Sequence, residues 1–161
     1  MHITFKDIQQ SRKDFLDKYS NRKVELQEAA RKLVAEYVDS LSLPSELWVD
    51  GNNVPHPYVA VGYFNEKKLF QQMPINGFDL DDDYRLKFKI STVVDDSKSG
   101  GGSYYVTSVA LWKDQGRLYV ELENGQEKLC VEDHNGNRPF FEVCAAIKQL
   151  VLLGCCDMRL D

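Results

Sequence analysis

Hydrophobic residues recur at every third or fourth position over residues 6–42, which is the spacing of one face of an α-helix. The clearest stripe consists of Leu26, Ala30, Leu33, Tyr37 and Leu41. A weaker set precedes it, made of Phe5, Ile8, Phe15, Leu16 and Tyr19. The polar patch Ser20-Asn21-Arg22 lies between the two sets, so the pattern fits either one long helix or two shorter ones. Pro44 disfavours the helical conformation at Leu43 and sets the end of this region.

From residue 46 the period changes from 3.6 to 2, the alternation of a half-buried β-strand. The sequence predicts about six strands, at residues 58–64, 67–73, 84–94, 104–113, 117–123 and 127–132. Leu47–Val49 could add a short one, and Asn124-Gly125 favours a two-residue hairpin turn with positive φ at both positions. The connections are too short for parallel crossovers, which favours an antiparallel meander.

A second helix is predicted near the end of the chain, with Asn137 as N-cap, a body from Pro139 to Leu153 and a stop at Gly154. It is apolar on almost every side. One face of a sheet could not cover it alone, so either the N-terminal helix or a second copy must pack against it. The second alternative makes a homodimer the expectation.

Together these patterns predict a single α+β domain spanning residues 1–161. Residues 1–43 form its helical part and 46–133 its antiparallel sheet, and the helix at 137–154 packs on the apolar face of that sheet. In element order alone, the chain resembles the helix-grip lipid-binding folds and the cone-shaped folds related to nuclear transport factors. That resemblance implies a pocket between sheet and helix, for which the candidate lining residues are Phe88, Ile90, Val106, Trp112, Phe140 and Phe141.

The composition is that of an ordinary globular protein, with 43% hydrophobic and 28% charged residues. Acidic residues exceed basic ones by 25 to 20, and residues 44–138 carry fifteen acidic against ten basic side chains. This balance argues against a nucleic-acid partner. No apolar run is long enough for a membrane span, and the N-terminus does not resemble a signal peptide. Four cysteines without a regular spacing are expected to be free thiols, so we expect a cytoplasmic protein.

The most conspicuous charged cluster is the acidic loop of residues 79–83, which contains Asp79, Asp81, Asp82 and Asp83. Alternate aspartates imitate the start of a calcium-binding loop. However, Tyr84 stands where that loop needs glycine, and Ile90 stands where it needs the closing glutamate. A solvated loop is the simplest interpretation. The functional one is a surface that attracts a protein partner with a basic surface.

Other candidate chemistry is weak. Asp133 and His134 are adjacent in a polar turn, where neighbouring side chains rarely orient one another for catalysis. The histidines and cysteines lack the spacing of a zinc site, and no cofactor motif occurs. We therefore expect no metal, no cofactor and no enzymatic activity.

The sequence accordingly favours a non-enzymatic, cytoplasmic protein-binding domain that acts through its acidic surface, as inhibitors, immunity proteins and secretion chaperones do. The alternative is a small apolar-ligand binder with a pocket between the curved sheet and the C-terminal helix.

Overall fold

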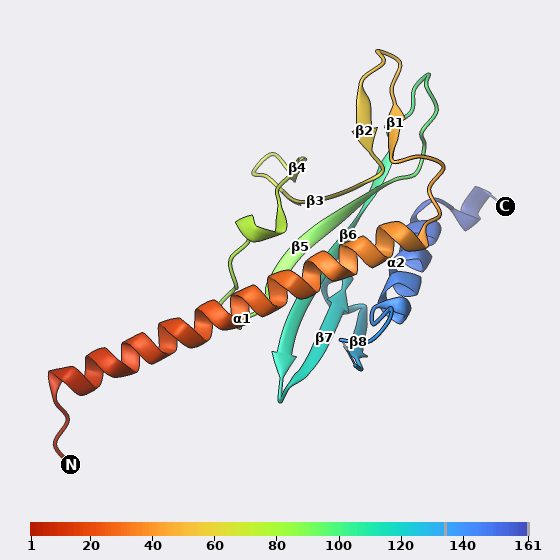
Figure 1. Ribbon diagram of the computed structural model, residues 1–161. Helices are drawn as coiled ribbons and strands as arrows, with labels where there is room; N and C mark the ends of the chain where they lie inside the picture. Colours follow the sequence, from red (N-terminus) through yellow and green to blue (C-terminus); the bar gives the residue numbers. More distant parts are fainter. Residues whose placement is uncertain (134, 161) are drawn as a thin grey trace.

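Two α-helices pack on one face of a six-stranded antiparallel sheet in the computed structural model, which describes residues 1–133 and 135–160 (Figure 1). The helices are α1 (Phe5–Ser40) and α2 (Phe141–Gly154), and three short 3₁₀ turns occur at Ile75–Gly77 (η1), Glu123–Gly125 (η2) and Met158–Leu160 (η3). The strands of the large sheet are β3 (Val59–Phe64), β4 (Phe70–Gln72), β5 (Leu86–Val93), β6 (Tyr104–Asp114), β7 (Arg117–Leu122) and β8 (Glu127–Val131). The predicted α+β class, with its helical ends and six strands, is confirmed.

The strand order of the large sheet is β4-β3-β5-β6-β7-β8. From β5 to β8 it is a meander of neighbouring hairpins. Before β5 the chain departs from a meander, because β3 lies between β4 and β5 and pairs with both. The hairpin at Asn124-Gly125 has positive φ at both residues, as predicted, but Leu122 pairs with Glu127, so four residues form the loop instead of two.

A separate small hairpin precedes this sheet, formed by β1 (Leu47–Val49) and β2 (Pro55–Pro57). The carboxylate of Asp50 holds its turn by accepting hydrogen bonds from the backbone N–H groups of Asn52 (2.8 Å) and Val54 (3.0 Å). It also lies 2.8 Å from Nε2 of His56, whose ring stacks on Trp48.

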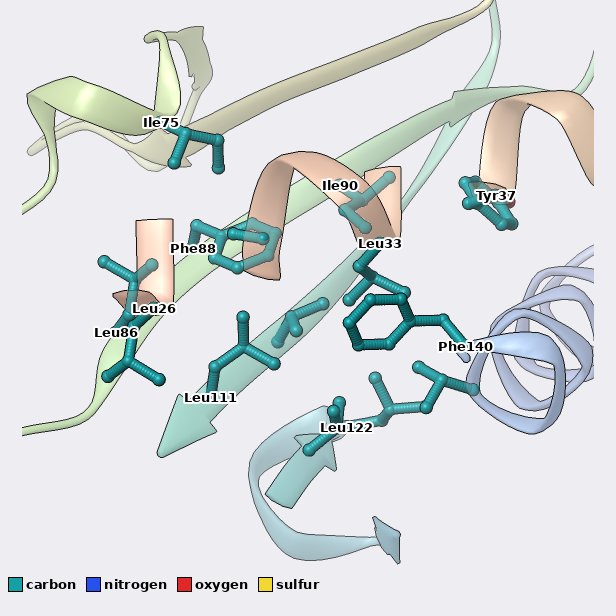
Figure 2. Close-up of a cluster of buried hydrophobic side chains, with 14 of the residues drawn as sticks. Leu26, Leu33, Tyr37, Ile75, Leu86, Phe88, Ile90, Leu111, Leu122 and Phe140 are labelled. Carbon is teal, nitrogen blue, oxygen red and sulfur yellow. The ribbon is translucent and has the colours of Figure 1, made fainter. Parts of the chain in front are cut away.

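The core lies between the sheet and the two helices (Figure 2). Alternate residues of β5 and β6 point into it, and they meet one face of α1. Leu33, Leu111 and Phe140 are fully or almost fully buried there. Burial of this apolar surface is the main stabilising contribution.

α1 is one continuous helix of 36 residues, which resolves the alternative that its polar patch left open. It begins with a capping box, in which the Thr4 hydroxyl accepts from the Asp7 N–H and the Asp7 carboxylate accepts from the Thr4 N–H. The helix ends at Ser40, three residues before Leu43, because Ser42 adopts a positive φ of 50°. No helix in the described part of the chain has the length and apolar character that crossing a membrane requires.

α2 starts at Phe141, two residues later than predicted, and Asn137 does not cap it. The cap comes instead from α1: a carboxylate oxygen of Glu36 accepts from the Phe140 N–H at 3.1 Å. α2 packs against β6, β8 and α1 with Val143, Cys144 and Ile147 buried. Phe141, Leu152 and Leu153 remain exposed on its outer side.

Candidate functional site

The first half of α1 extends beyond the sheet into solvent (Figure 1). At 1.5 Å per residue the helix is about 54 Å long. The longest strand has 11 residues and is therefore about 36 Å long. Every residue from Phe5 to Lys18 is exposed, whereas burial begins at Tyr19 and becomes complete at Leu26. We call residues 5–19 the arm.

One side of the arm is apolar. Phe5, Ile8, Phe15 and Leu16 retain 72%, 58%, 41% and 46% of their accessible surface. At 100° per residue these four side chains and Tyr19 lie in phase with Leu26, Leu33 and Tyr37, so the arm continues the face that α1 turns toward the core. We call this face of the arm the stripe. Contiguous exposed apolar surface of this kind marks interaction sites in soluble proteins.

Charged side chains lie around the stripe. Lys13 lies beyond one edge and Lys18 beyond the other, and Arg12 lies within the stripe, with its guanidinium 5.4 Å from the centre of the Phe15 ring. Asp7 lies on the same side as Lys18, and Lys6 projects away from the stripe, at about 140° from its centre. Asp14 and Asp17 lie on the opposite side of the helix. The stripe therefore combines apolar contact surface with one cation, Arg12, in its middle.

At its inner end the stripe meets the loop before β5. The ring of Tyr84 lies 6.4 Å from Phe15 and 6.2 Å from Tyr19, edge-on to both. A tight turn at Asp81 places it there: the Asp81 carboxylate accepts from the N–H groups of Asp83 and Arg85, and Tyr84 has a φ of 59°. Tyr84 remains 45% exposed, so it extends the stripe.

The acidic loop lies beside this end of the arm, and its four carboxylates differ in their surroundings. Asp79 pairs with Lys23 of α1 at 2.5 Å, and Asp81 pairs with Lys87 of β5 at 3.0 Å. Burial tends to raise the pKa of Asp81, but the hydrogen bonds from the Arg85 N–H, Lys87 and the Asp83 N–H outweigh it and lower that pKa. Asp82 and Asp83 are exposed. Two of the four predicted contact residues thus have internal partners, and the other two face solvent.

The six candidates for an apolar-ligand pocket do not line one cavity. Phe88, Ile90 and Phe140 are packed in the core. Paired residues of neighbouring strands point to the same face of a sheet, and the register pairs Phe88 with Val109. Odd-numbered residues of β6 therefore face the core. The even-numbered Val106 and Trp112 point to the opposite, outer face. Phe141 is 66% exposed on α2. The interior between sheet and helices is filled by side chains (Figure 2).

The outer face of the sheet carries a row of cations and aromatic rings that the sequence did not reveal. The Arg85 guanidinium lies 4.1 Å from the centre of the Trp112 ring, which stacks on Tyr119 at 5.6 Å and 15°. Lys128 lies 5.5 Å from both rings. Arg85 also pairs with Glu121 of β7 at 3.5 Å. These groups satisfy one another, so we interpret the row as support for an uncovered sheet face.

A shallow hollow of about 320 Å³ lies on the same outer face, between Lys87, Lys89 and Glu121. Lys89 donates to the Ser108 hydroxyl at 2.6 Å and lies 4.9 Å from the centre of the Phe64 ring. The hollow is broadly open to solvent, and its charged groups have partners: Lys87 pairs with Asp81, Lys89 with Ser108 and Glu121 with Arg85.

The remaining candidate chemistry is dispersed. His134 lies outside the described residues, and the described residues contain no group of three or more His, Cys, Asp or Glu side chains placed to hold a metal ion. Cys144 is buried against Glu36, with 3.6 Å between Sγ and Oε2. Burial and the neighbouring carboxylate raise the pKa of this thiol to about 12, which keeps it protonated.

The exposure of the arm is not visible in the sequence pattern. The pattern shows the hydrophobic positions of the arm as a weaker set that precedes the main stripe of the helix. The available signal was length, because a helix of 36 residues exceeds what strands of at most 11 residues can cover.

No protein-family model, curated protein or solved structure matches this chain. Its function is therefore inferred from its surfaces alone.

Proposed function

We propose that this protein is a non-enzymatic, cytoplasmic protein-binding domain that engages its partner through the arm. One observation carries the proposal: the stripe exposes Phe5, Ile8, Phe15 and Leu16 together on a continuous helix that the domain leaves uncovered. Exposed large apolar side chains at i, i+3, i+7 and similar spacings are how an amphipathic helix docks into a partner's groove. The four free cysteines support a reducing compartment.

The acidic loop contributes the second part of the proposed surface. Asp82 and Asp83 are exposed beside Tyr84, at the inner end of the stripe. Charges at the rim of an apolar contact steer association and select the partner more than they add affinity. A partner that covers the stripe would thus present a basic group near residues 82 and 83.

The test is site-specific photo-crosslinking in cells that make the tagged chain. A benzophenone amino acid replaces Gln9, at the edge of the stripe, and in the control it replaces Glu66, which is exposed at the β3–β4 turn. We expect a discrete adduct from position 9 and none from position 66. Ile8→Asp should abolish the adduct while leaving the melting temperature unchanged, because Ile8 is exposed and outside the core.

Equal yields at positions 9 and 66, or no adduct at either, would contradict the proposal. The variant Asp82→Asn/Asp83→Asn tests the acidic loop separately. A reduced crosslinking yield supports its role, and an unchanged yield removes the loop from the binding surface.

A further inference from the structure

We infer that the stripe pairs with the stripe of a second copy of this chain, with the two arms antiparallel and the twofold axis near Arg12. This inference rests on the proposed function, since it names the protein that the arm binds. Three features of the arm support it: the shape of the stripe, the charges at its base and the area that it offers.

The shape of the stripe is self-complementary only in the antiparallel direction. Each arm has a small apolar group at its tip, Phe5 and Ile8, and a larger one at its base, where Phe15, Leu16 and Tyr19 meet Tyr84. Arg12 separates the two groups, and its guanidinium lies over the Phe15 ring, which directs the charge of each copy along its own helix and away from the axis. Antiparallel pairing about residue 12 places the tip of one arm on the base of the other, twice over. A twofold interface has this reciprocity by necessity.

Charge favours the same orientation. The base of each arm carries the exposed carboxylates of Asp82 and Asp83. Antiparallel pairing places the two acidic loops at opposite ends of the paired arms. Parallel pairing would instead place two acidic loops side by side, where like charges repel. It would also bring the two sheets to the same end of the helix pair.

The area is sufficient for a specific contact. With full side chains taken as roughly 200 Å² each, the exposed fractions of Phe5, Ile8, Phe15, Leu16 and Tyr84 amount to about 500 Å² per copy. If all of this surface were covered, two copies would bury about 1,000 Å², which is near the lower limit for a specific protein–protein interface. A weak, reversible dimer is the expected result.

The first test is the mass in solution, measured by sedimentation equilibrium between about 1 and 100 µM. The protein should approach twice its protomer mass of 18.5 kDa at the upper concentrations. Phe5→Asp/Ile8→Asp should give a single protomer at every concentration, with an unchanged near-UV circular dichroism spectrum. The matched control is Leu152→Asp, which charges the exposed face of α2 and should leave the dimer intact.

The second test fixes the orientation. In a background with the exposed Cys130, Cys155 and Cys156 replaced by serine, Phe5→Cys and Tyr19→Cys chains should form a disulfide-linked heterodimer when mixed and oxidised. Phe5→Cys alone should remain monomeric on a non-reducing gel.

If the measured mass stays at that of one protomer up to 100 µM, the inference is overturned. This holds even when the arm binds a different protein or anionic vesicles. Efficient crosslinking of Phe5→Cys alone would also overturn it, because that result requires parallel arms. A dimer lost with Leu152→Asp and kept with Phe5→Asp/Ile8→Asp would move the interface to α2. Crosslinking of another protein at position 9 by a monomeric chain would leave the proposed function standing without this inference.

Discussion

At the scale of single residues, a few buried polar groups join elements that are distant in the sequence. Tyr37 is fully buried, and its hydroxyl lies 2.8 Å from the Thr92 hydroxyl of β5. Glu36, one position earlier, caps α2 through the Phe140 N–H. These contacts fix the position of α1 relative to the sheet and α2, which apolar packing alone would define less sharply.

Tyr37→Phe should lower the free energy of unfolding by about 1–3 kcal/mol, because Thr92 then keeps a buried hydroxyl without its partner. Urea denaturation measures the change. Tyr37→Phe/Thr92→Val should recover most of the loss, since neither polar group then remains. A single variant as stable as the parent would show that the hydroxyl pair contributes nothing.

Cys144 should be the least reactive of the four thiols. Its burial and the nearby Glu36 raise its pKa to about 12, whereas Cys130, Cys155 and Cys156 are exposed. A disulfide reagent at pH 8 should modify three thiols in the native protein and the fourth only after unfolding. Cys144→Ala should remove the reaction that occurs only after unfolding and leave the three reactions of the native protein unchanged. Four equally fast reactions would contradict this assignment.

At the scale of elements, the β1–β2 hairpin is held by one carboxylate. Its contact with His56 is the largest cause that lowers the pKa of Asp50, and the hydrogen bonds from the Val54 and Asn52 N–H groups lower it further. A carboxyl group whose folded pKa is depressed stabilises the fold above its unfolded pKa of about 3.9. That contribution is lost as the pH falls through the folded value.

The hairpin should therefore loosen in acid with a midpoint below about pH 3.9. The amide proton shifts of Asn52 and Val54 report the Asp50 carboxylate directly, and two-dimensional NMR follows them across the titration. Asp50→Asn should flatten both curves. A midpoint at or above the ordinary aspartate value would mean that the carboxylate does not accept these hydrogen bonds in solution.

The elements themselves were predictable because their hydrophobic periods were regular, but the pairing between β5 and β6 was not. Trp112 and Val106 were assigned to the same face as Phe88 and Ile90. The register pairs Phe88 with Val109 and thereby places Trp112 on the outer face. Which residues of β6 face the core depends on the conformation of the ten-residue connection between the two strands, and local propensity does not specify that conformation.

The candidate site was predictable only in pieces. The acidic loop was recognised, but its pairing of Asp79 with Lys23 joins residues 56 positions apart and depends on how α1 crosses the sheet. The apolar positions of the arm were recognised as well. Their exposure follows from the comparison of helix length with strand length, which is a property of the assembled fold.

At the scale of the whole molecule, the protein divides into a packed domain and an uncovered extension. Residues up to Lys18 are exposed and contribute no member of the buried core. α1 therefore serves two purposes: its second half completes the core, and its first half presents the stripe.

Deletion of residues 1–13 should leave a folded domain, because Phe15 and Tyr19 still contact Tyr84. At 1 µM, where association is minor, the free energy of unfolding should change by no more than about 0.5 kcal/mol, as for other changes at exposed positions. The denaturant slope should also be nearly unchanged, since little surface is lost from the core. A loss of several kcal/mol would mean that the arm is part of the cooperative unit.

The contact between Glu36 and Phe140 also has a consequence for synthesis of the chain. Its two residues are separated by 104 positions. At translation rates of 5–20 residues per second, the ribosome needs roughly 5 to 20 s to make the intervening segment. During that interval α1 has emerged, but the strands and α2 that cover Leu26, Leu33 and Tyr37 are incomplete. The nascent helix thus carries both its future core face and its stripe unprotected, and it is the segment on which a ribosome-associated chaperone would act first.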